Sequence, residues 1–197
     1  VFKVLQPAIR FAKDECLDLP DVMYQTRDIP LSAQVQKFYK QLKDQMMIEA
    51  AGAQVSAVNA AAGLNKLLQI SGGAVYTDDH NIIEFDVSPR LQVLKEVMDE
   101  ALHKVIVFIP YKHTIKLVQE SLTKDHVSTE IISGDVSANQ RSAIFNRFQT
   151  TDDPQVLLIQ PQSASHGVTL TAASIVVFWS PVMSVETYLQ CIARIDR

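Results

Sequence analysis

The chain has 197 residues and a formal net charge of −4 at pH 7, with 47% hydrophobic and 20% charged side chains. These values are typical of a soluble globular protein, and the acidic balance excludes a uniformly basic surface while allowing a local nucleic-acid groove. The sequence has no run of about 18 apolar residues and no signal-peptide pattern, which argues against a membrane-spanning or secreted protein and predicts a cytoplasmic one.

The first 73 residues predict little besides helices. Residues 1–30 contain three prolines that break any long helix, so this segment is not predicted to fold as a unit. Ser32 is a candidate N-cap for a helix with one apolar stripe, made of Val35, Phe38, Tyr39, Leu42 and Met46. The alanine-rich stretch 54–70 predicts a second helix, with a mobile surface segment as the alternative, and the glycines at 72 and 73 end it.

From residue 74 the pattern changes to strands and helices. Residues 74–85 predict a β-hairpin around a polar turn. Ser88 is expected to cap the next helix, with Pro89 at its first position. The buried stripe of that helix is expected to be Leu91, Leu94, Val97, Met98 and Ala101.

Four short, mostly β-branched runs follow, separated by helical segments: "KVIVFIP", "VSTEIIS", "QVLLIQP" and "ASIVVFW". Helical periodicity places Tyr111, Ile115, Val118 and Leu122 on one stripe, and Ile144, Phe145 and Phe148 on another; Ser137 and Gln140 have the spacing of a capping box. This alternation predicts an α/β domain with a mostly parallel sheet covered by helices on both faces. Ligands are then expected at the carboxyl ends of the strands.

The last residues, "QCIARIDR", predict a helix that continues to the end of the sequence. At about 100° per residue, Gln190, Arg194 and Arg197 fall within roughly 60° of one another. The opposite side is apolar and is made of Val185, Tyr188, Leu189, Ile192 and Ile195. We expect the apolar face to pack and the polar face to reach outward; the alternative is an ordinary solvated helix face.

The two cysteines suggest no special chemistry. Cys16 and Cys191 lie far apart and have no metal-site spacing with each other or with any histidine. Neither a disulfide framework nor a zinc site is predicted, and both are expected to be reduced packing residues.

The segments "KVIVFIPYKHTIKLVQESL", "IISGDVSANQRSAIFNRF", "VLLIQPQSASHGVTLTAASIVVFWS" and "YLQCIARIDR" together resemble the C-terminal RecA-like lobe of superfamily-two helicases. The resemblance is greatest to the Swi/Snf-like branch of bacteria and phages. It implies that residues 1–30 are the linker from a first lobe, 31–73 a helical extension, and 74–197 a RecA-like lobe truncated at its last motif.

The resemblance implies roles for individual residues. Gln190, Arg194 and Arg197 match motif six, whose arginines reach a triphosphate held by the first lobe, where a guanidinium stabilises the charge of the transferring phosphoryl group. The segment 162–173 resembles motif five, and its candidates for nucleic-acid or nucleotide contacts are Ser163, Ser165, His166, Gly167 and Thr169.

Two further segments match nucleic-acid motifs. Gly134, Asp135 and Arg141 match the extension of motif four, at a helix start whose free amides suit a phosphate. Lys112 and His113 match motif four itself. The alternatives are an ordinary strand–turn–helix for the first set and solvated side chains for the second.

The resemblance also says what the chain lacks. It has no Gly-Lys-Ser or Gly-Lys-Thr phosphate loop and no Asp-Glu box, which this family carries on its first lobe together with ATP and Mg²⁺. The chain by itself is therefore expected to be inactive as an ATPase. Within a longer protein it is expected to serve an ATP-dependent translocase or helicase acting on DNA, most of all double-stranded DNA. The alternatives are an α/β binding or scaffolding domain, and an RNA-directed or protein-remodelling ATPase of the same superfamily.

Overall fold

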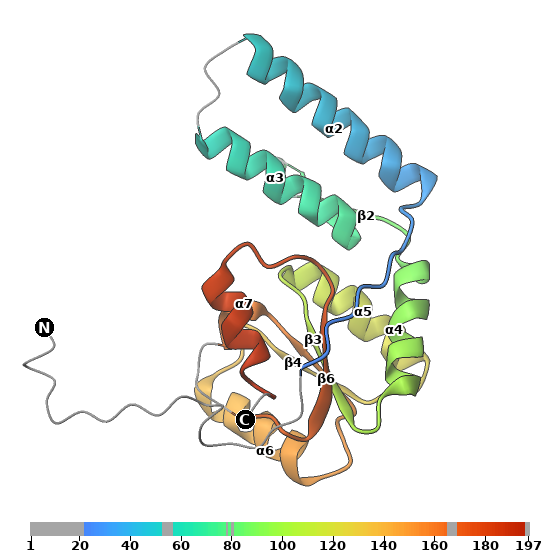
Figure 1. Ribbon diagram of the computed structural model, residues 1–197, viewed down its shortest axis with the longest axis vertical. Helices are drawn as coiled ribbons and strands as arrows, with labels where there is room; N and C mark the ends of the chain where they lie inside the picture. Colours follow the sequence, from blue (N-terminus) through green and yellow to red (C-terminus); the bar gives the residue numbers. More distant parts are fainter. Residues whose placement is uncertain (1–21, 53–56, 78, 80, 165–168, 196–197) are drawn as a thin grey trace, which may run out of the picture.

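The computed structural model describes residues 22–52, 57–77, 79, 81–164 and 169–195. Two parts can be followed in Figure 1. An α/β lobe lies at the bottom, and a pair of long helices projects from it.

The lobe is built on a parallel sheet of four strands. These are β3 (Lys104–Phe108), β4 (Thr129–Ile132), β5 (Val156–Ile159) and β6 (Ala173–Phe178). Their order is β4-β5-β3-β6, and all neighbours run parallel. The parallel sheet predicted from the four β-branched runs is therefore confirmed.

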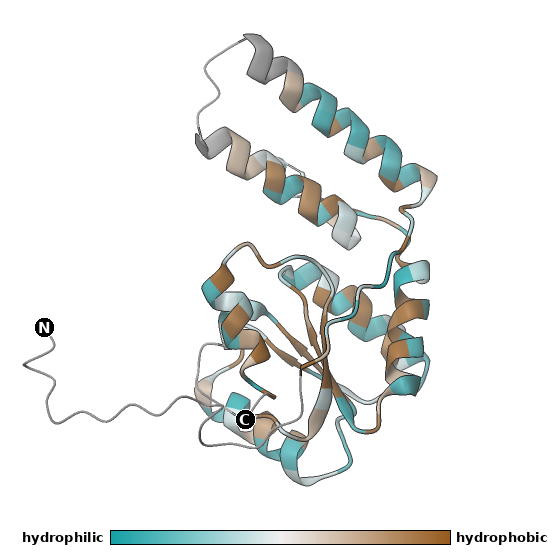
Figure 2. Cartoon of the chain, viewed as in Figure 1, coloured by the Kyte–Doolittle hydropathy of each residue, from teal (hydrophilic) through white to brown (hydrophobic). Residues whose placement is uncertain are grey.

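Helices cover both faces of this sheet. Helices α4 (Ser88–Glu100) and α5 (Lys112–Lys124) pack on one face, and α6 (Ala138–Thr150) and α7 (Val185–Ile192) on the other. Because side chains alternate along a strand, Val105, Val107, Val156 and Leu158 face α4 and α5, whereas Ile106, Phe108, Leu157 and Ile159 face α6 and α7. Figure 2 shows the strands of the sheet in brown, with helices that carry both brown and teal on either side.

Helix starts follow the local chemistry. Ser137 and Gln140 form the predicted capping box of α6. The prediction that Ser88 caps α4 is wrong, because the N-cap is Val87. The Ser88 amide instead donates to Oδ1 of Asp86 at 2.9 Å, so the helix begins one residue earlier than expected.

The helical extension contains α2 (Ala33–Gly52) and α3 (Ala57–Gly72), followed by the antiparallel strands β1 (Ala74–Tyr76) and β2 (Ile82–Glu84). Both helices and the hairpin were predicted and are confirmed. Ser32 Oγ accepts a hydrogen bond from the Val35 amide, as expected of a cap. The hairpin shares one apolar cluster with the two helices, made of Val35, Ile70, Val75 and Phe85. The domain boundary between residues 73 and 74 stays a prediction.

Trp179 joins the extension to the lobe. Its buried indole Nε1 donates to the Gly72 carbonyl oxygen at 2.8 Å, at the end of α3. The Arg90 guanidinium donates to the Trp179 carbonyl oxygen at 2.7 Å and lies 5.6 Å from the indole centroid. Gly73, which follows Gly72 at the end of α3, has a φ of +114°. This conformation suits glycine and turns the chain from α3 into the hairpin.

Candidate functional site

The loops that follow β3, β4 and β5 meet at one edge of the sheet, because parallel strands end on the same side. Lys112 begins α5 just after β3, and Gly134 and Asp135 follow β4. The two segments that the sequence singled out separately are thus brought together in space.

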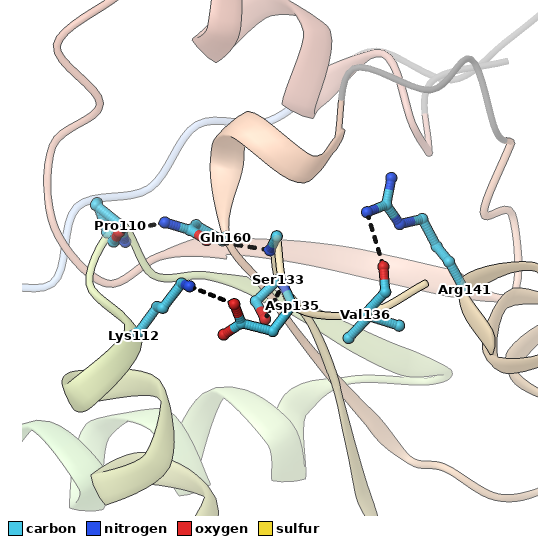
Figure 3. A network of polar contacts seen from close by, with 8 residues as sticks. Pro110, Lys112, Ser133, Asp135, Val136, Arg141 and Gln160 are labelled. Carbon is cyan, nitrogen blue, oxygen red and sulfur yellow. Dashed lines mark hydrogen bonds and ion pairs between the residues drawn. The ribbon is translucent and has the colours of Figure 1, made fainter. Parts of the chain in front are cut away.

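Lys112 and Asp135 form an ion pair across this edge. Lys112 Nζ lies 2.6 Å from Asp135 Oδ1, and the two side chains are 48% and 72% exposed (Figure 3). Both groups are open to solvent, so an arriving anion could reach the ammonium. Any such anion would compete with the Asp135 carboxylate for the Lys112 ammonium.

Gln160, which sequence reasoning missed, links the same two loops (Figure 3). Its Nε2 donates to the Pro110 carbonyl oxygen at 3.3 Å, and its Oε1 accepts from the Gly134 amide at 3.5 Å. The backbone N–H of Gln160 donates to the Ile132 carbonyl oxygen at 2.8 Å. The only signal in the sequence was a polar residue directly after the buried run Val156–Ile159, and that signal is weak.

Gly134 and Arg141 border the same edge. A Cβ at Gly134 would meet no atom within 4 Å, so packing does not require glycine there and the backbone is open to a ligand. Arg141, in the first turn of α6, folds back over the loop and donates from Nη2 to the Val136 carbonyl oxygen at 3.3 Å (Figure 3). Its guanidinium therefore lies beside the β4–α6 loop.

His113 contacts another part of the molecule. Its Nε2 lies 2.6 Å from Glu84 Oε1, and its ring meets Tyr76 edge-on with centroids 6.4 Å apart. The imidazole thus joins the first turn of α5 to the hairpin. A nucleic-acid contact by His113 stays a prediction.

The segment matched to motif five is only partly described. Ser165, His166 and Gly167 lie outside the described residues. Ser163 lies in the 3₁₀ turn η2 (Pro161–Ala164) and is buried. A phosphate contact by its hydroxyl stays a prediction. Thr169 is half-buried and already has an interaction partner.

The end of the chain differs most from expectation. Helix α7 stops at Ile192, and Arg194 is only 6% exposed. The Arg194 Nε donates to the Gln190 carbonyl oxygen at 3.0 Å, and its own carbonyl oxygen accepts from the Leu170 amide at 2.7 Å. The prediction that Arg194 reaches outward is wrong, because residues 193–195 form a turn and the helical rotation no longer applies. Arg197 lies outside the described residues.

The apolar face predicted for the same helix is also partly wrong. Val185 and Leu189 are 72% and 58% exposed, whereas Cys191 is fully buried. Tyr188 packs on Phe178 with ring centroids 4.8 Å apart. The helix is therefore rotated so that Cys191, rather than Leu189, enters the core. Gln190 is half-buried, and its side chain donates to Glu186 Oε1 at 3.1 Å.

Residues 89–197 match the family model of the helicase conserved C-terminal domain. This chain belongs to that family. Protein p41 of Acyrthosiphon pisum secondary endosymbiont phage 1 is 26% identical over 90% of this chain and 37% of its own length. The uncharacterized ATP-dependent helicase MG018 of Mycoplasma genitalium is 24% identical over 86% of this chain and 17% of its own length. The chain thus spans well under half the length of these relatives.

A solved structure shares the fold of this helicase lobe. The Sulfolobus solfataricus SWI2/SNF2 ATPase core in complex with dsDNA matches with a TM-score of 0.62 and 19% identity, over 76% of this chain and 33% of that one. The predicted helicase C-terminal lobe with a RecA-like fold is therefore confirmed, and its fold is similar to that of a SWI2/SNF2 ATPase core.

A cavity of about 310 Å³ lies where the helicase lobe meets its helical extension. It is lined by the strand-end loops, by the start of α7 and by α3; among its residues are Asn65, Tyr111, Gln162, Pro181, Met183 and Ser184. The Tyr111 hydroxyl lies 2.9 Å from Asn65 Oδ1, and the burial of Tyr111 raises its pKa. This volume lies at the small end of the range for ligand pockets.

The interior beside α7 holds an uncharged thiol. Burial raises the pKa of Cys191 to about 12, and the nearby Arg194 guanidinium acts in the opposite direction. Within the part of the chain that the structure describes, no group of three or more His, Cys, Asp or Glu side chains is placed to hold a metal ion. No described helix of this helicase lobe is long and apolar enough to cross a membrane.

Proposed function

We propose that this lobe serves an ATP-dependent DNA translocase and contacts the sugar–phosphate backbone of duplex DNA at its strand-end edge. The observation that carries the proposal is the meeting of Lys112, the open Gly134 backbone and Arg141 at one edge of a helicase-family lobe. The similar SWI2/SNF2 ATPase core, whose structure contains dsDNA, supports the choice of DNA.

The chemistry of this edge fits a phosphate better than a base. Lys112 presents a compact positive charge, Arg141 a planar one, and the Gly134 backbone allows close approach. Groups of this kind position a protein on the backbone and carry no sequence information directly. Binding is therefore expected to be independent of sequence and to weaken steeply with salt.

We assign to Arg197 the contact with the nucleotide triphosphate. ATP with Mg²⁺ supplies the phosphoryl-transfer chemistry, and we propose that a first lobe of the same protein holds both. Arg194, being buried, acts as a positioning residue: its carbonyl oxygen ties the end of α7 to the Leu170 amide, within the segment matched to motif five. Gln190 lies one turn before Arg194, and its carbonyl oxygen holds the Arg194 guanidinium.

Closing of the two lobes around nucleotide would bring Arg197 to the triphosphate, and reopening would separate Arg197 from the nucleotide. Such domain motions are common in enzymes that couple a chemical step to movement. Repeated cycles would step the backbone contacts at Lys112 and Arg141 along one strand.

The test uses the complete protein and its DNA-stimulated ATPase. Lys112→Gln and Arg141→Gln should each weaken duplex binding, and Arg141→Gln should lower the slope of log affinity against log salt by about 0.9. The matched control is Arg147→Gln, which removes the same charge near the opposite end of α6. Arg197→Ala should lower kcat while DNA binding is unchanged.

Unchanged ATPase rates in Arg197→Ala would contradict the nucleotide role and favour a scaffolding domain. Equal losses in all three charge variants would show a general charge effect and overturn the assigned edge. Stimulation by RNA, and by neither duplex nor single-stranded DNA, would replace DNA with RNA as the substrate.

A further inference from the structure

A carboxylate lies in the middle of the surface proposed to bind phosphate. Asp135 Oδ1 is 2.6 Å from Lys112 Nζ, and both residues come from segments that meet only in the folded lobe. A negative charge at this place repels a phosphate, so the acid is unexpected if its one task is to help binding.

We propose that Asp135 holds the place of a backbone phosphate at Lys112 and is exchanged for that phosphate when DNA binds. The inference rests on the proposed function, because it concerns the same edge and the same ligand. In this role Asp135 weakens DNA binding, whereas the family resemblance implied that it contacts the nucleic acid directly.

The exchange suits the exposure of the pair. Half of the Lys112 side chain and most of the Asp135 side chain lie in solvent, where an ion pair is held only weakly. Lysine carries its charge on a flexible stem, so the ammonium can turn from one oxygen to another without moving α5.

Hydrogen bonds hold the loop that carries Asp135. Gln160 bonds the Gly134 amide and the Pro110 carbonyl, which joins the loop after β4 to the loop after β3. The Asp135 amide also donates to Ser133 Oγ at 3.4 Å. The carboxylate is therefore held beside Lys112 by the backbone as well as by charge.

The expected consequence is a lower affinity for the DNA backbone than Lys112 would give without Asp135. A lysine that already has a carboxylate partner contributes less to the release of counterions that drives backbone binding. A translocase must dissociate from each phosphate as it steps, and a carboxylate that competes for the lysine favours that dissociation.

The experiment compares Asp135→Asn with Glu130→Gln in the complete protein. Glu130 pairs with Arg147 on β4 and α6, so its variant removes the same charge from an ion pair away from the strand-end loops. Binding of a fluorescent duplex of arbitrary sequence is followed by anisotropy over a salt series. Asp135→Asn should bind about three- to fivefold tighter at low salt, with a slope steeper by about 0.9, and Glu130→Gln should match the wild type.

Two more variants complete the test. Asp135→Ser removes the carboxylate with a smaller side chain and should give the same gain. Lys112→Gln should abolish the gain when combined with Asp135→Asn, because the carboxylate acts through that lysine.

The outcomes separate the two proposals. If Lys112→Gln weakens binding and Asp135→Asn fails to strengthen it, the exchange is overturned and the proposed function stands. If Lys112→Gln has no effect, the proposed DNA edge fails, and the exchange fails with it. An equal gain in DNA affinity in Glu130→Gln would overturn the exchange, because it would show that the net charge of the protein causes the gain.

Discussion

Arg194 provides the sharpest test of how the lobe is built. The perturbation is Arg194→Met, which keeps an unbranched apolar stem and removes the guanidinium. If the side chain is interior, as its 6% exposure indicates, the variant should be less stable than the wild type. If it reached outward, the variant should unfold at the same temperature.

The magnitude follows from the contact that is lost. The Arg194 Nε donates to the Gln190 carbonyl oxygen at 3.0 Å, close to the end of α7. A hydrogen bond to a charged group contributes about 1.5–3 kcal/mol. We therefore expect a loss of about 2–3 kcal/mol in the free energy of unfolding. For a chain of this size that loss corresponds to about 4–12 °C in Tm.

The matched control is Arg147→Met. Arg147 lies on α6 with its side chain about half exposed and pairs with Glu130 in solvent, so its loss should cost less than about 1 kcal/mol. The assay is urea unfolding of the complete protein and both variants, followed by circular dichroism. Equal midpoints for the two variants would refute the interior position of Arg194 and restore an outward guanidinium.

Two further predictions concern buried groups. Trp179→Phe removes the indole donor and leaves the Gly72 carbonyl oxygen unpaired, so urea unfolding should show a loss of about 1–3 kcal/mol; an unchanged midpoint would mean that water replaces the donor. The Cys191 pKa is raised to about 12, so the folded state keeps its proton where the unfolded thiol has lost it. Stability should be unaffected below about pH 9 and fall by up to about 1.4 kcal/mol per pH unit above it. In Cys191→Ala this part of the loss should vanish; an identical pH dependence in both proteins would contradict the prediction.

Much of the fold could be predicted because its signals are local. The run Val156–Ile159 is a strand buried on both faces, and such a strand reads as continuous apolar sequence. The capping box of Ser137 and Gln140 involves only neighbouring residues, so its spacing is visible without a structure. The four family motifs were readable for the same reason, since each is a short segment.

The candidate site could be predicted residue by residue but not as an arrangement. Lys112 and Asp135 stand 23 positions apart, and nothing in their spacing says that they form an ion pair. Gln160 carries no motif, yet it bonds both loops. These contacts depend on the order of strands in the sheet, which brings β5 between β4 and β3.

The end of α7 shows the limit most clearly. Periodicity alone assigned Leu189 to the core and Arg194 to solvent, and the lobe does the reverse. A helix of eight residues has too few turns for its own pattern to fix its rotation, so packing against β6 decides which side enters the core. The sequence by itself determined the strands, the longer helices and the family. Only the tertiary structure decided which charges are paired, buried or exposed, because those depend on neighbours that the chain brings together from a distance.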